Sequence, residues 1–205
     1  MNEATTLYLV RHGETAWSIS GQHTGLTDIA LTVRGEDQAR ALAPYFAKLR
    51  FACVLSSPLM RARRTCELAG LAAAAQSEPE LVEWNYGDYE GRRSADIVKE
   101  RPGWSVWADG CPHGETPAMV SERADRLLLR LRAIRGKVAL FSHGQFGSAL
   151  AARWIGLPVG QGQHLELSPA TLSTLSVARD HPDVAVISLW NSAPAVTAQT
   201  SRGNP

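Results

Sequence analysis

Two short apolar segments of this chain are each followed by a histidine. Residues 7–10 lead directly into Arg11 and His12. Residues 138–142 lead directly into His143. Each segment suits a buried strand, and open α/β sheets bind ligands just outside the carboxyl ends of their strands. We therefore expect two imidazoles and one guanidinium to meet at one edge of a sheet, an arrangement suited to binding an anion.

Phosphoryl transfer is the chemistry that these residue types support. A neutral imidazole attacks phosphorus readily and can split the transfer into two steps through a phosphohistidine. The equatorial oxygens of the transferring group need several donors, for which Arg11, Arg61 and His143 are the candidates. Gly144 would let the backbone approach the anion closely. A helix starting near Gln145 would point its positive end at the same place.

The alkoxide that leaves in such a transfer needs a proton, so a carboxylic acid is expected in the pocket. Glu83 is the favoured candidate because it is flanked by the aromatic residues Trp84 and Tyr86, which would exclude water. Charge alone does not separate it from three other glutamates, Glu14, Glu90 and Glu115.

Length and composition describe an ordinary globular chain. The 205 residues fit one domain, with 44% hydrophobic and 20% charged residues. A net charge of +1 argues against binding of nucleic acid through bulk charge. No apolar run approaches the ~20 residues that span a bilayer, and the first residues do not resemble a signal peptide. The expected partner is a small phosphorylated metabolite, with no nucleic acid or membrane, and a homo-oligomer is left open.

The cysteines indicate a reducing compartment. Cys53, Cys66 and Cys111 form no even, closely spaced framework of the kind that disulfide-rich secreted proteins show. The first two fall in apolar strand and helix patterns and are expected in the core, and Cys111 is expected in an exposed loop. These features predict a cytoplasmic protein.

Strands and helices alternate along the chain, which predicts an α/β domain with a mainly parallel sheet covered on both faces. Thr32 and Thr116 stand where N-caps of two helices would be. The segment 76–111 has little periodicity and is expected to leave the sheet and form a pocket wall. The expected strands are residues 6–10, 52–56, 137–142, 172–177 and 184–190, and the expected helices are residues 33–49, 61–68, 117–135 and 145–155. The domain is expected to span residues 1–192, with a flexible tail from 193 to 205.

Four motifs together resemble the histidine phosphatase (phosphoglycerate mutase-like) superfamily. They occur in the family order and are Arg11-His12-Gly13-Glu14-Thr15, Ser56-Ser57-Pro58-Leu59-Met60-Arg61-Ala62, Glu83 with Tyr86-Gly87, and Ser142-His143-Gly144. The resemblance implies a three-layer αβα fold, with His12 as the phosphorylated nucleophile and Glu83 as the proton donor that later activates water. It also implies that Arg11, Arg61 and His143 bind the phosphoryl group, and that neither a metal nor an organic cofactor is needed.

A closer resemblance is to the branch that contains fungal sedoheptulose-1,7-bisphosphatase. The segments that carry it are 17–28, 83–91 and 107–116. By this resemblance Thr24, Gly25 and Tyr86 contact the substrate, with Gly144 beside them. The expected enzyme is a metal-independent phosphatase that hydrolyses a sugar bisphosphate such as sedoheptulose 1,7-bisphosphate.

Two departures from the superfamily favour hydrolysis over isomerisation. Phosphoglycerate mutases usually have asparagine where this chain has Ser18, and a lysine where it has Ser94. A mutase must hold a bisphosphorylated intermediate and exclude water, for which this pocket is less equipped. The alternatives are a phosphoglycerate mutase, which would need a bisphosphoglycerate primer, and a non-enzymatic binding member of the fold. Every motif residue is present, which disfavours the second alternative.

Overall fold

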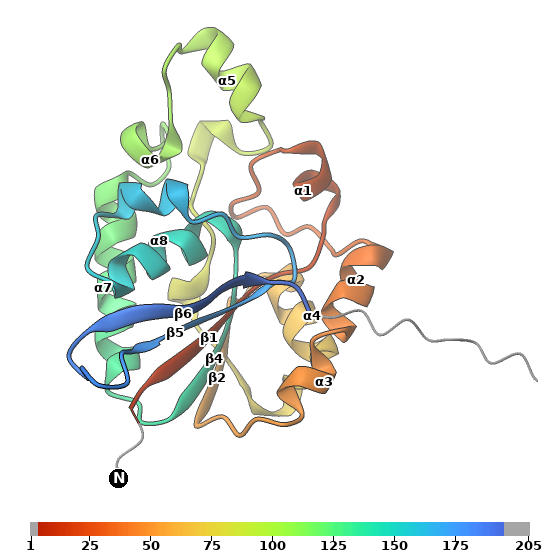
Figure 1. The fold of residues 1–205 in the computed structure, drawn as a ribbon. Coiled ribbons are helices and arrows are strands. Elements are labelled where there is room, and N and C mark those ends of the chain that lie inside the picture. The colour runs from red at the N-terminus through yellow and green to blue at the C-terminus, as the bar shows by residue number, and fades with distance from the viewer. Residues whose placement is uncertain (1–3, 195–205) are drawn as a thin grey trace, which may run out of the picture.

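A six-stranded sheet forms the centre of the computed structural model, which describes residues 4–194 (Figure 1). The strands run in the order β3-β2-β4-β1-β5-β6. Strands β1, β2, β3 and β4 are parallel, β5 pairs antiparallel with β1, and the edge strand β6 pairs antiparallel with β5. The predicted α/β fold with a mainly parallel sheet is therefore confirmed. The strands are β1 (Thr6–Arg11), β2 (Cys53–Ser56), β3 (Ala75–Ser77), β4 (Lys137–Ser142), β5 (Leu172–Val177) and β6 (Ala185–Ser192).

Helices cover both faces of the sheet, with α7 and α8 on one side and α2, α3 and α4 on the other (Figure 1). Because successive residues of a strand point to opposite faces, β1 contributes to two cores. Leu7 and Leu9 pack in the larger core with α7 and α8, and Tyr8 and Val10 pack in the smaller one. The helices are α1 (Ala16–Ser20), α2 (Val33–Arg40), α3 (Ala43–Phe46), α4 (Met60–Leu68), α5 (Ser94–Glu100), α6 (Val106–Asp109), α7 (Pro117–Arg132) and α8 (Gly144–Trp154), with short 3-10 turns at Ala72–Ala74, Pro79–Leu81, Gly87–Tyr89 and Val159–His164.

The predicted helix 33–49 is two helices, α2 and α3, with a break at residues 41–42. Pro44 lies in the first turn of α3, and it has no N–H to donate to a carbonyl of the preceding turn. Both predicted N-caps are confirmed. The Thr32 hydroxyl accepts from the N–H of Gly35, and the Thr116 hydroxyl accepts from the N–H of Met119.

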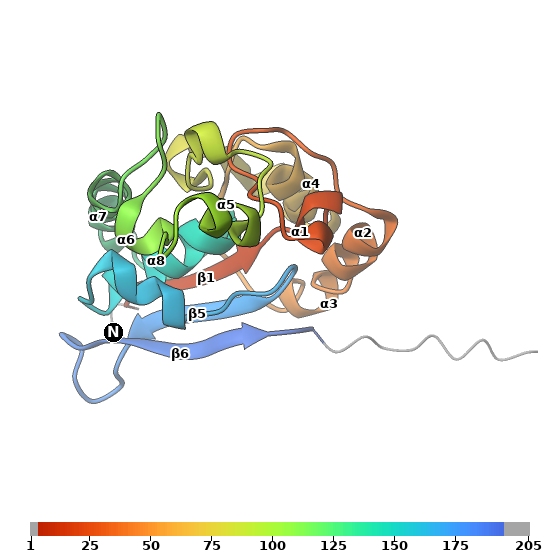
Figure 2. The same cartoon turned by 90° about the horizontal axis from the view of Figure 1, so that it is seen from above.

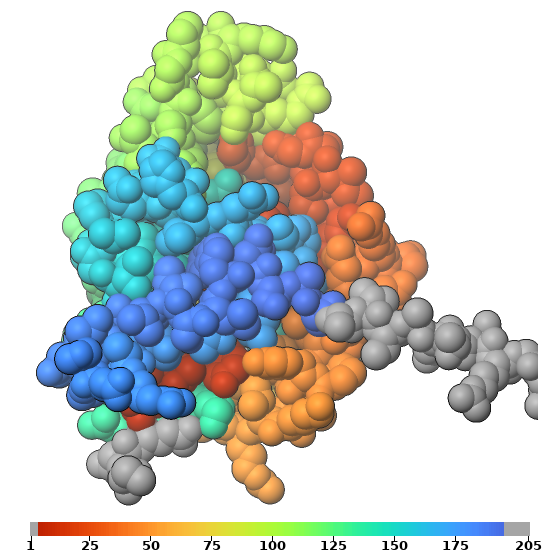
Figure 3. Space-filling model, viewed as in Figure 1, coloured from red at the N-terminus to blue at the C-terminus, as the bar shows by residue number. Residues whose placement is uncertain are grey.

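Residues 76 and 77 of the segment that was expected to leave the sheet belong to β3, a strand that was not predicted. The rest of the segment leaves the sheet and carries α5 and α6 beyond the carboxyl ends of the parallel strands (Figures 1 and 2). It packs inward through Trp84 and Trp104, which are 0% and 6% exposed. Beside it runs the loop after α1, which it meets at an isolated bridge between Gln22 and Arg93. The space-filling view shows these two segments side by side above the sheet (Figure 3). They form a cover over the strand ends.

The cysteine predictions were right in two cases and wrong in the third. The Cys66 side chain is buried and that of Cys53 is partly buried, and all three cysteines are free thiols. Cys111 is 7% exposed, against the expected exposed loop, because the loop before α7 folds back under Trp104. Burial raises the pKa of the Cys66 and Cys111 thiols to about 12, so both are unreactive at neutral pH.

Strand β6 ends at Ser192, and residues 195–205 of the expected tail lie outside the described residues. No helix within residues 4–194 is long and apolar enough to cross a membrane.

Candidate active site

The two strand-end histidines lie side by side. Strands β1 and β4 pair in parallel with Arg11 opposite Ser142, so His12 and His143 emerge next to each other at the carboxyl edge. Their ring centroids are 5.2 Å apart. Parallel pairing therefore brings together residues that are more than a hundred positions apart in the sequence.

His12 is held as a neutral imidazole. Its Nδ1 lies 2.7 Å from the carbonyl oxygen of Gly13, which can only accept, so Nδ1 carries the proton and Nε2 keeps its lone pair. The ring is 4% exposed. Burial lowers the pKa of His12 well below its usual value, and the charges of Arg11 and Arg61 lower it further. The imidazole therefore stays uncharged at neutral pH, with its one proton on Nδ1.

Arg61 is fully buried, and its guanidinium both holds neighbouring groups in place and adds a positive charge beside His12 and His143. Its Nη1 and Nη2 donate to the carbonyl oxygens of Thr24, Gly25 and Thr27, at 2.8–3.0 Å. Its Nε donates to Nδ1 of His143 at 3.1 Å. These bonds use four of the five N–H groups of the guanidinium, and Arg61 does not line the cavity that contains His12. Arg61 thus fixes the loop after α1 to the strand ends.

The contact with Arg61 decides the protonation of His143. Since Nδ1 accepts from a guanidinium, the proton of the neutral ring is on Nε2, which lies 2.8 Å from the Ser57 hydroxyl. Burial and the neighbouring Arg61 lower the pKa of His143 well below its usual value. His143 is therefore uncharged, and its N–H is directed at Ser57 instead of at the cavity that His12 lines.

Arg11 has a buried donor with no partner. Its Nη1 donates to the carbonyl of Leu167, and its Nε is the one buried side-chain atom within residues 4–194 that lacks a hydrogen bond. A Cβ at Gly144 would lie 3.3–3.4 Å from the Arg11 guanidinium, which explains the glycine there. An unsatisfied buried donor is costly unless a ligand supplies the acceptor. The oxygen of a phosphate is such an acceptor.

Glu83 is 4% exposed and lies at the N-terminus of α8. Its carboxylate accepts from the backbone N–H groups of Trp84, Gln145 and Phe146, at 2.9, 3.1 and 2.7 Å. We expected the start of α8 to point at the anion. That expectation was wrong for two of its amides, because Glu83 already accepts from them.

The other three candidate acids are engaged in bracing the fold. Glu14 accepts from the Thr32 hydroxyl, and Glu90 accepts from the N–H of Gly25. Glu115 forms a two-point ion pair with the buried Arg123. Within this set, Glu83 is the glutamate that lines the same cavity as His12.

That cavity has a volume of about 180 Å³ and opens between the loop after α1 and the segment after Glu83. Thr24 and Tyr86 line it as expected. Gly25 does not, because its N–H donates to Glu90 and its carbonyl accepts from Arg61. Gly144 lines an adjoining cavity of about 370 Å³. The lining residues are Arg11, His12, Trp17, Ser18, Gly21, Gln22, His23, Thr24, Glu83, Tyr86, Ser94 and Gln145.

Seven of these residues were not predicted as site residues: Trp17, Ser18, Gly21, Gln22, His23, Ser94 and Gln145. Gln145 directly follows the second His-Gly pair, and residues 17–23 lie in a segment that carries the closer family resemblance, so both had a sequence signal. Gln22 reaches the cavity through its bridge to Arg93, a contact between distant segments that no local pattern indicates.

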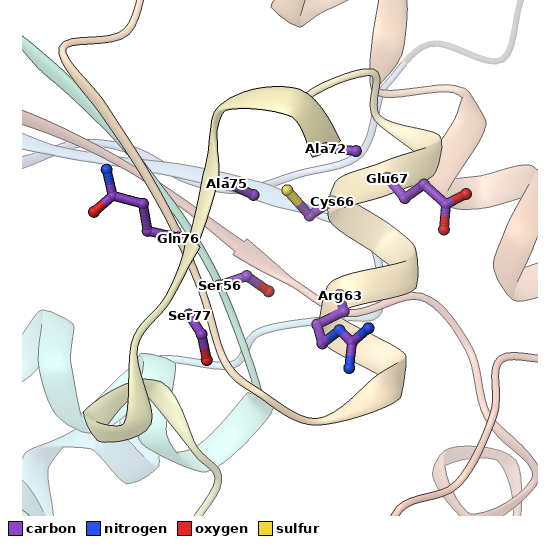
Figure 4. Close-up of a pocket in the computed structure, with 8 residues that line it drawn as sticks. All are labelled: Ser56, Arg63, Cys66, Glu67, Ala72, Ala75, Gln76 and Ser77. Carbon is purple, nitrogen blue, oxygen red and sulfur yellow. The ribbon is translucent and has the colours of Figure 1, made fainter.

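A separate cavity, of about 300 Å³, lies between α4 and β3 (Figure 4). Its walls include Arg63, Cys66 and Ser77, and it contains none of the predicted catalytic side chains. Arg63 is exposed, and Arg64 pairs with Glu36 and Glu67, as expected for a solvated helix face. Within residues 4–194 no group of three or more histidine, cysteine or acidic side chains could hold a metal ion.

Comparison with known proteins assigns the family. The model of the histidine phosphatase superfamily (branch 1) matches residues 7–191. The chain belongs to this superfamily. An acid phosphatase of Mycobacterium tuberculosis is 37% identical over 94% of this chain and 96% of its own. Sedoheptulose 1,7-bisphosphatase of Saccharomyces cerevisiae is 36% identical, over 74% of this chain and 68% of its own.

The fold agrees with this histidine phosphatase assignment. The solved structure of an open reading frame of Mycobacterium tuberculosis superposes with a TM-score of 0.85 at 35% identity, covering 93% of this chain and 98% of that one. Since its relatives are named phosphatases, this histidine phosphatase is an enzyme that hydrolyses phosphate monoesters.

The buried histidines of this histidine phosphatase predict loss of stability in acid. Burial lowers the pKa of His12, His143 and His23, in the last case to about 4. As pH falls below about 6.5, these histidines take up protons in the unfolded chain but not in the folded one, so the free energy of unfolding decreases. Each such histidine contributes up to about 1.4 kcal/mol per pH unit. Urea unfolding at a series of pH values measures this slope. A stability that did not change between pH 7 and pH 5 would contradict the prediction.

Proposed function

We propose that this enzyme hydrolyses small phosphorylated metabolites in two steps, without a metal, through a phosphohistidine on His12. The observation that carries the proposal is the state of His12, whose Nδ1–H is held by Gly13 and whose Nε2 is free. Arg11 and Glu83 line the same cavity, and Arg11 has a buried Nε without a partner to offer a phosphoryl oxygen. His143 lies beside His12, and its Nε2–H would have to turn from Ser57 to a phosphoryl oxygen to add a further donor. These are the groups that the chemistry requires.

In the first step, Nε2 of His12 attacks phosphorus and forms an N–P bond as the ester P–O bond breaks. Glu83, in its protonated form, gives its proton to the leaving oxygen, so that an alcohol departs. The positive charges of Arg11 and Arg61 stabilise the charge on the equatorial oxygens.

In the second step, water attacks the phosphohistidine. The Glu83 carboxylate takes a proton from the water, the N–P bond breaks, and inorganic phosphate and free His12 are restored. Glu83 thus returns to its protonated form, ready for the next substrate.

For the substrate we propose a sugar bisphosphate such as sedoheptulose 1,7-bisphosphate. The support is the 36% identity to the yeast enzyme of that name and the presence of Thr24 and Tyr86 in the cavity. Arg11 is the one arginine that lines the described cavity, and no lysine does. The second phosphate would therefore bind at the cavity mouth. The same lack of cations disfavours a mutase, which must grip two anions.

The free cysteines support a cytoplasmic location.

The experiment is phosphate release, in EDTA, from a panel of phosphate esters. The panel holds sedoheptulose 1,7-bisphosphate, fructose bisphosphates, phosphoglycerates, sugar monophosphates and p-nitrophenyl phosphate. We expect release from p-nitrophenyl phosphate and faster release from a ketose bisphosphate with a 1-phosphate. Release from p-nitrophenyl phosphate alone would reject the sugar substrate and keep the chemistry. Mutase activity in the presence of a bisphosphoglycerate primer, with no hydrolysis, would reject the proposal.

A further inference from the structure

His23 is positioned more tightly than its place in a surface loop requires. Its backbone N–H donates to the carbonyl of Arg92 at 2.8 Å, and its carbonyl accepts from the N–H of Gly91 at 2.9 Å. These two bonds fasten the loop after α1 to the segment that covers the strand ends. The position of the His23 side chain in the cavity wall is thereby fixed.

The ring of His23 is clamped between two aromatic residues. It stacks on Tyr86 with centroids 4.4 Å apart, and it meets Trp104 edge-on at 5.7 Å. It is 7% exposed. A phenylalanine would satisfy this packing equally well, and burying an imidazole without partners for its nitrogens is unfavourable. The two nitrogens therefore call for an explanation other than packing.

One nitrogen has a partner and the other does not. Nε2 lies 3.1 Å from the Ser94 hydroxyl. Nδ1 has no hydrogen-bond partner within residues 4–194. It is nevertheless accessible to solvent, because Arg11 Nε is the one side-chain nitrogen or oxygen in this range that is both fully buried and unpartnered. Because His23 lines the cavity beside His12, its Nδ1 is a polar atom that the cavity offers to a ligand.

The surroundings of this nitrogen indicate the kind of group it would bind. Burial lowers the pKa of His23 to about 4, so the ring is uncharged at neutral pH. The polar side chains near it in the cavity are also uncharged: Ser18, Gln22 and Ser94. Nδ1 donates or accepts according to the direction of the bond between Nε2 and Ser94, and a hydroxyl group can answer either role. The charged side chains that line the same cavity, Arg11 and Glu83, are those proposed to act on the phosphoryl group.

We propose that His23, held by Tyr86 and Ser94, binds a hydroxyl group of the leaving alcohol and so selects phosphate esters of hydroxylated metabolites. This inference rests on the proposed function and narrows its substrate class. It assigns His23 to specificity, not to the bond-breaking steps, which need His12 and Glu83.

The test is His23→Phe, which keeps the ring against Tyr86 and removes both nitrogens. Two substrates are compared: p-nitrophenyl phosphate, whose leaving group has no hydroxyl besides the one it gains, and the sugar phosphate of the panel that is hydrolysed fastest. We expect kcat/KM for the sugar ester to fall about tenfold more than that for p-nitrophenyl phosphate, mostly through KM, as for loss of one hydrogen bond. Equal losses on both substrates would overturn the proposal.

Two further variants separate binding from packing. Ser94→Ala removes an exposed hydroxyl and the anchor of Nε2, and it is expected to shift the ratio of the two kcat/KM values in the same direction; it serves also if His23→Phe does not fold. Tyr45→Leu is the control, because it changes an exposed ring in α3 that does not line the cavity, and it should leave the ratio unchanged. A Ser94→Ala ratio equal to wild type would count against the proposal.

A wild-type enzyme that hydrolyses p-nitrophenyl phosphate and no hydroxylated ester would also overturn it. In that case the phosphatase chemistry would stand and the specificity role would fall. Failure with every ester would instead reject the proposed function itself.

Discussion

The His12→Ala variant is expected to lose at least about 10⁴-fold in kcat on every substrate, because it removes the atom that forms the covalent bond to phosphorus. Arg11 and the other residues that line the cavity would remain to bind the substrate, so the loss should appear in kcat far more than in KM. Rapid quenching of the wild-type enzyme with p-nitrophenyl phosphate should trap phosphate on His12, and the variant should trap none.

The His12→Ala protein should remain folded. The ring lines a cavity and has one hydrogen bond to its neighbour Gly13. Its removal also relieves the cost of keeping a buried imidazole neutral in acid. His181→Ala is a matched control, since His181 lies exposed in the turn between β5 and β6. A folded His12→Ala enzyme with more than a few per cent of wild-type activity would reject the phosphohistidine mechanism.

Glu83→Gln is expected to have a large effect that depends on the leaving group. An amide cannot give up a proton, so hydrolysis of sugar phosphates, whose alkoxides leave poorly, should slow by about 10²–10⁴-fold. Formation of the phosphohistidine from p-nitrophenyl phosphate needs little protonation and should slow much less. Because Glu83 is also proposed to activate water, the phosphorylated enzyme should accumulate with p-nitrophenyl phosphate. Quenched-flow measurement of the burst and of the bound phosphate checks both effects.

Some loss of stability should accompany Glu83→Gln. The amide nitrogen cannot accept a hydrogen bond, so an N–H at the start of α8 loses a partner, at a cost of about 1–3 kcal/mol. Glu122→Gln, on the exposed face of α7, is the matched control for the change of charge. Equal rate losses on sugar phosphates and p-nitrophenyl phosphate, with no accumulation of phosphoenzyme, would assign the proton to another group.

The sequence predicted the framework of this protein because the relevant signals are local. Apolar runs of strand length, the N-caps Thr32 and Thr116 and the two His-Gly pairs each act within a few residues of the chain. Parallel pairing then follows from the alternation of strands and helices, and it places Arg11 and His12 beside His143. The superfamily and the edge of the sheet that holds the site could be read from the chain itself.

The tertiary structure decided which groups those residues meet. In the folded chain, Glu83 differs from Glu90 and Glu115 in its contact with the first amides of α8, about sixty residues away. The same kind of distant contact turns Gly25 away from the cavity, buries Cys111 and clamps His23 between Tyr86 and Trp104. Local patterns set secondary structure. The burial of a side chain, its partners and whether a nitrogen lacks a hydrogen bond depend on contacts that exist only after the chain has folded.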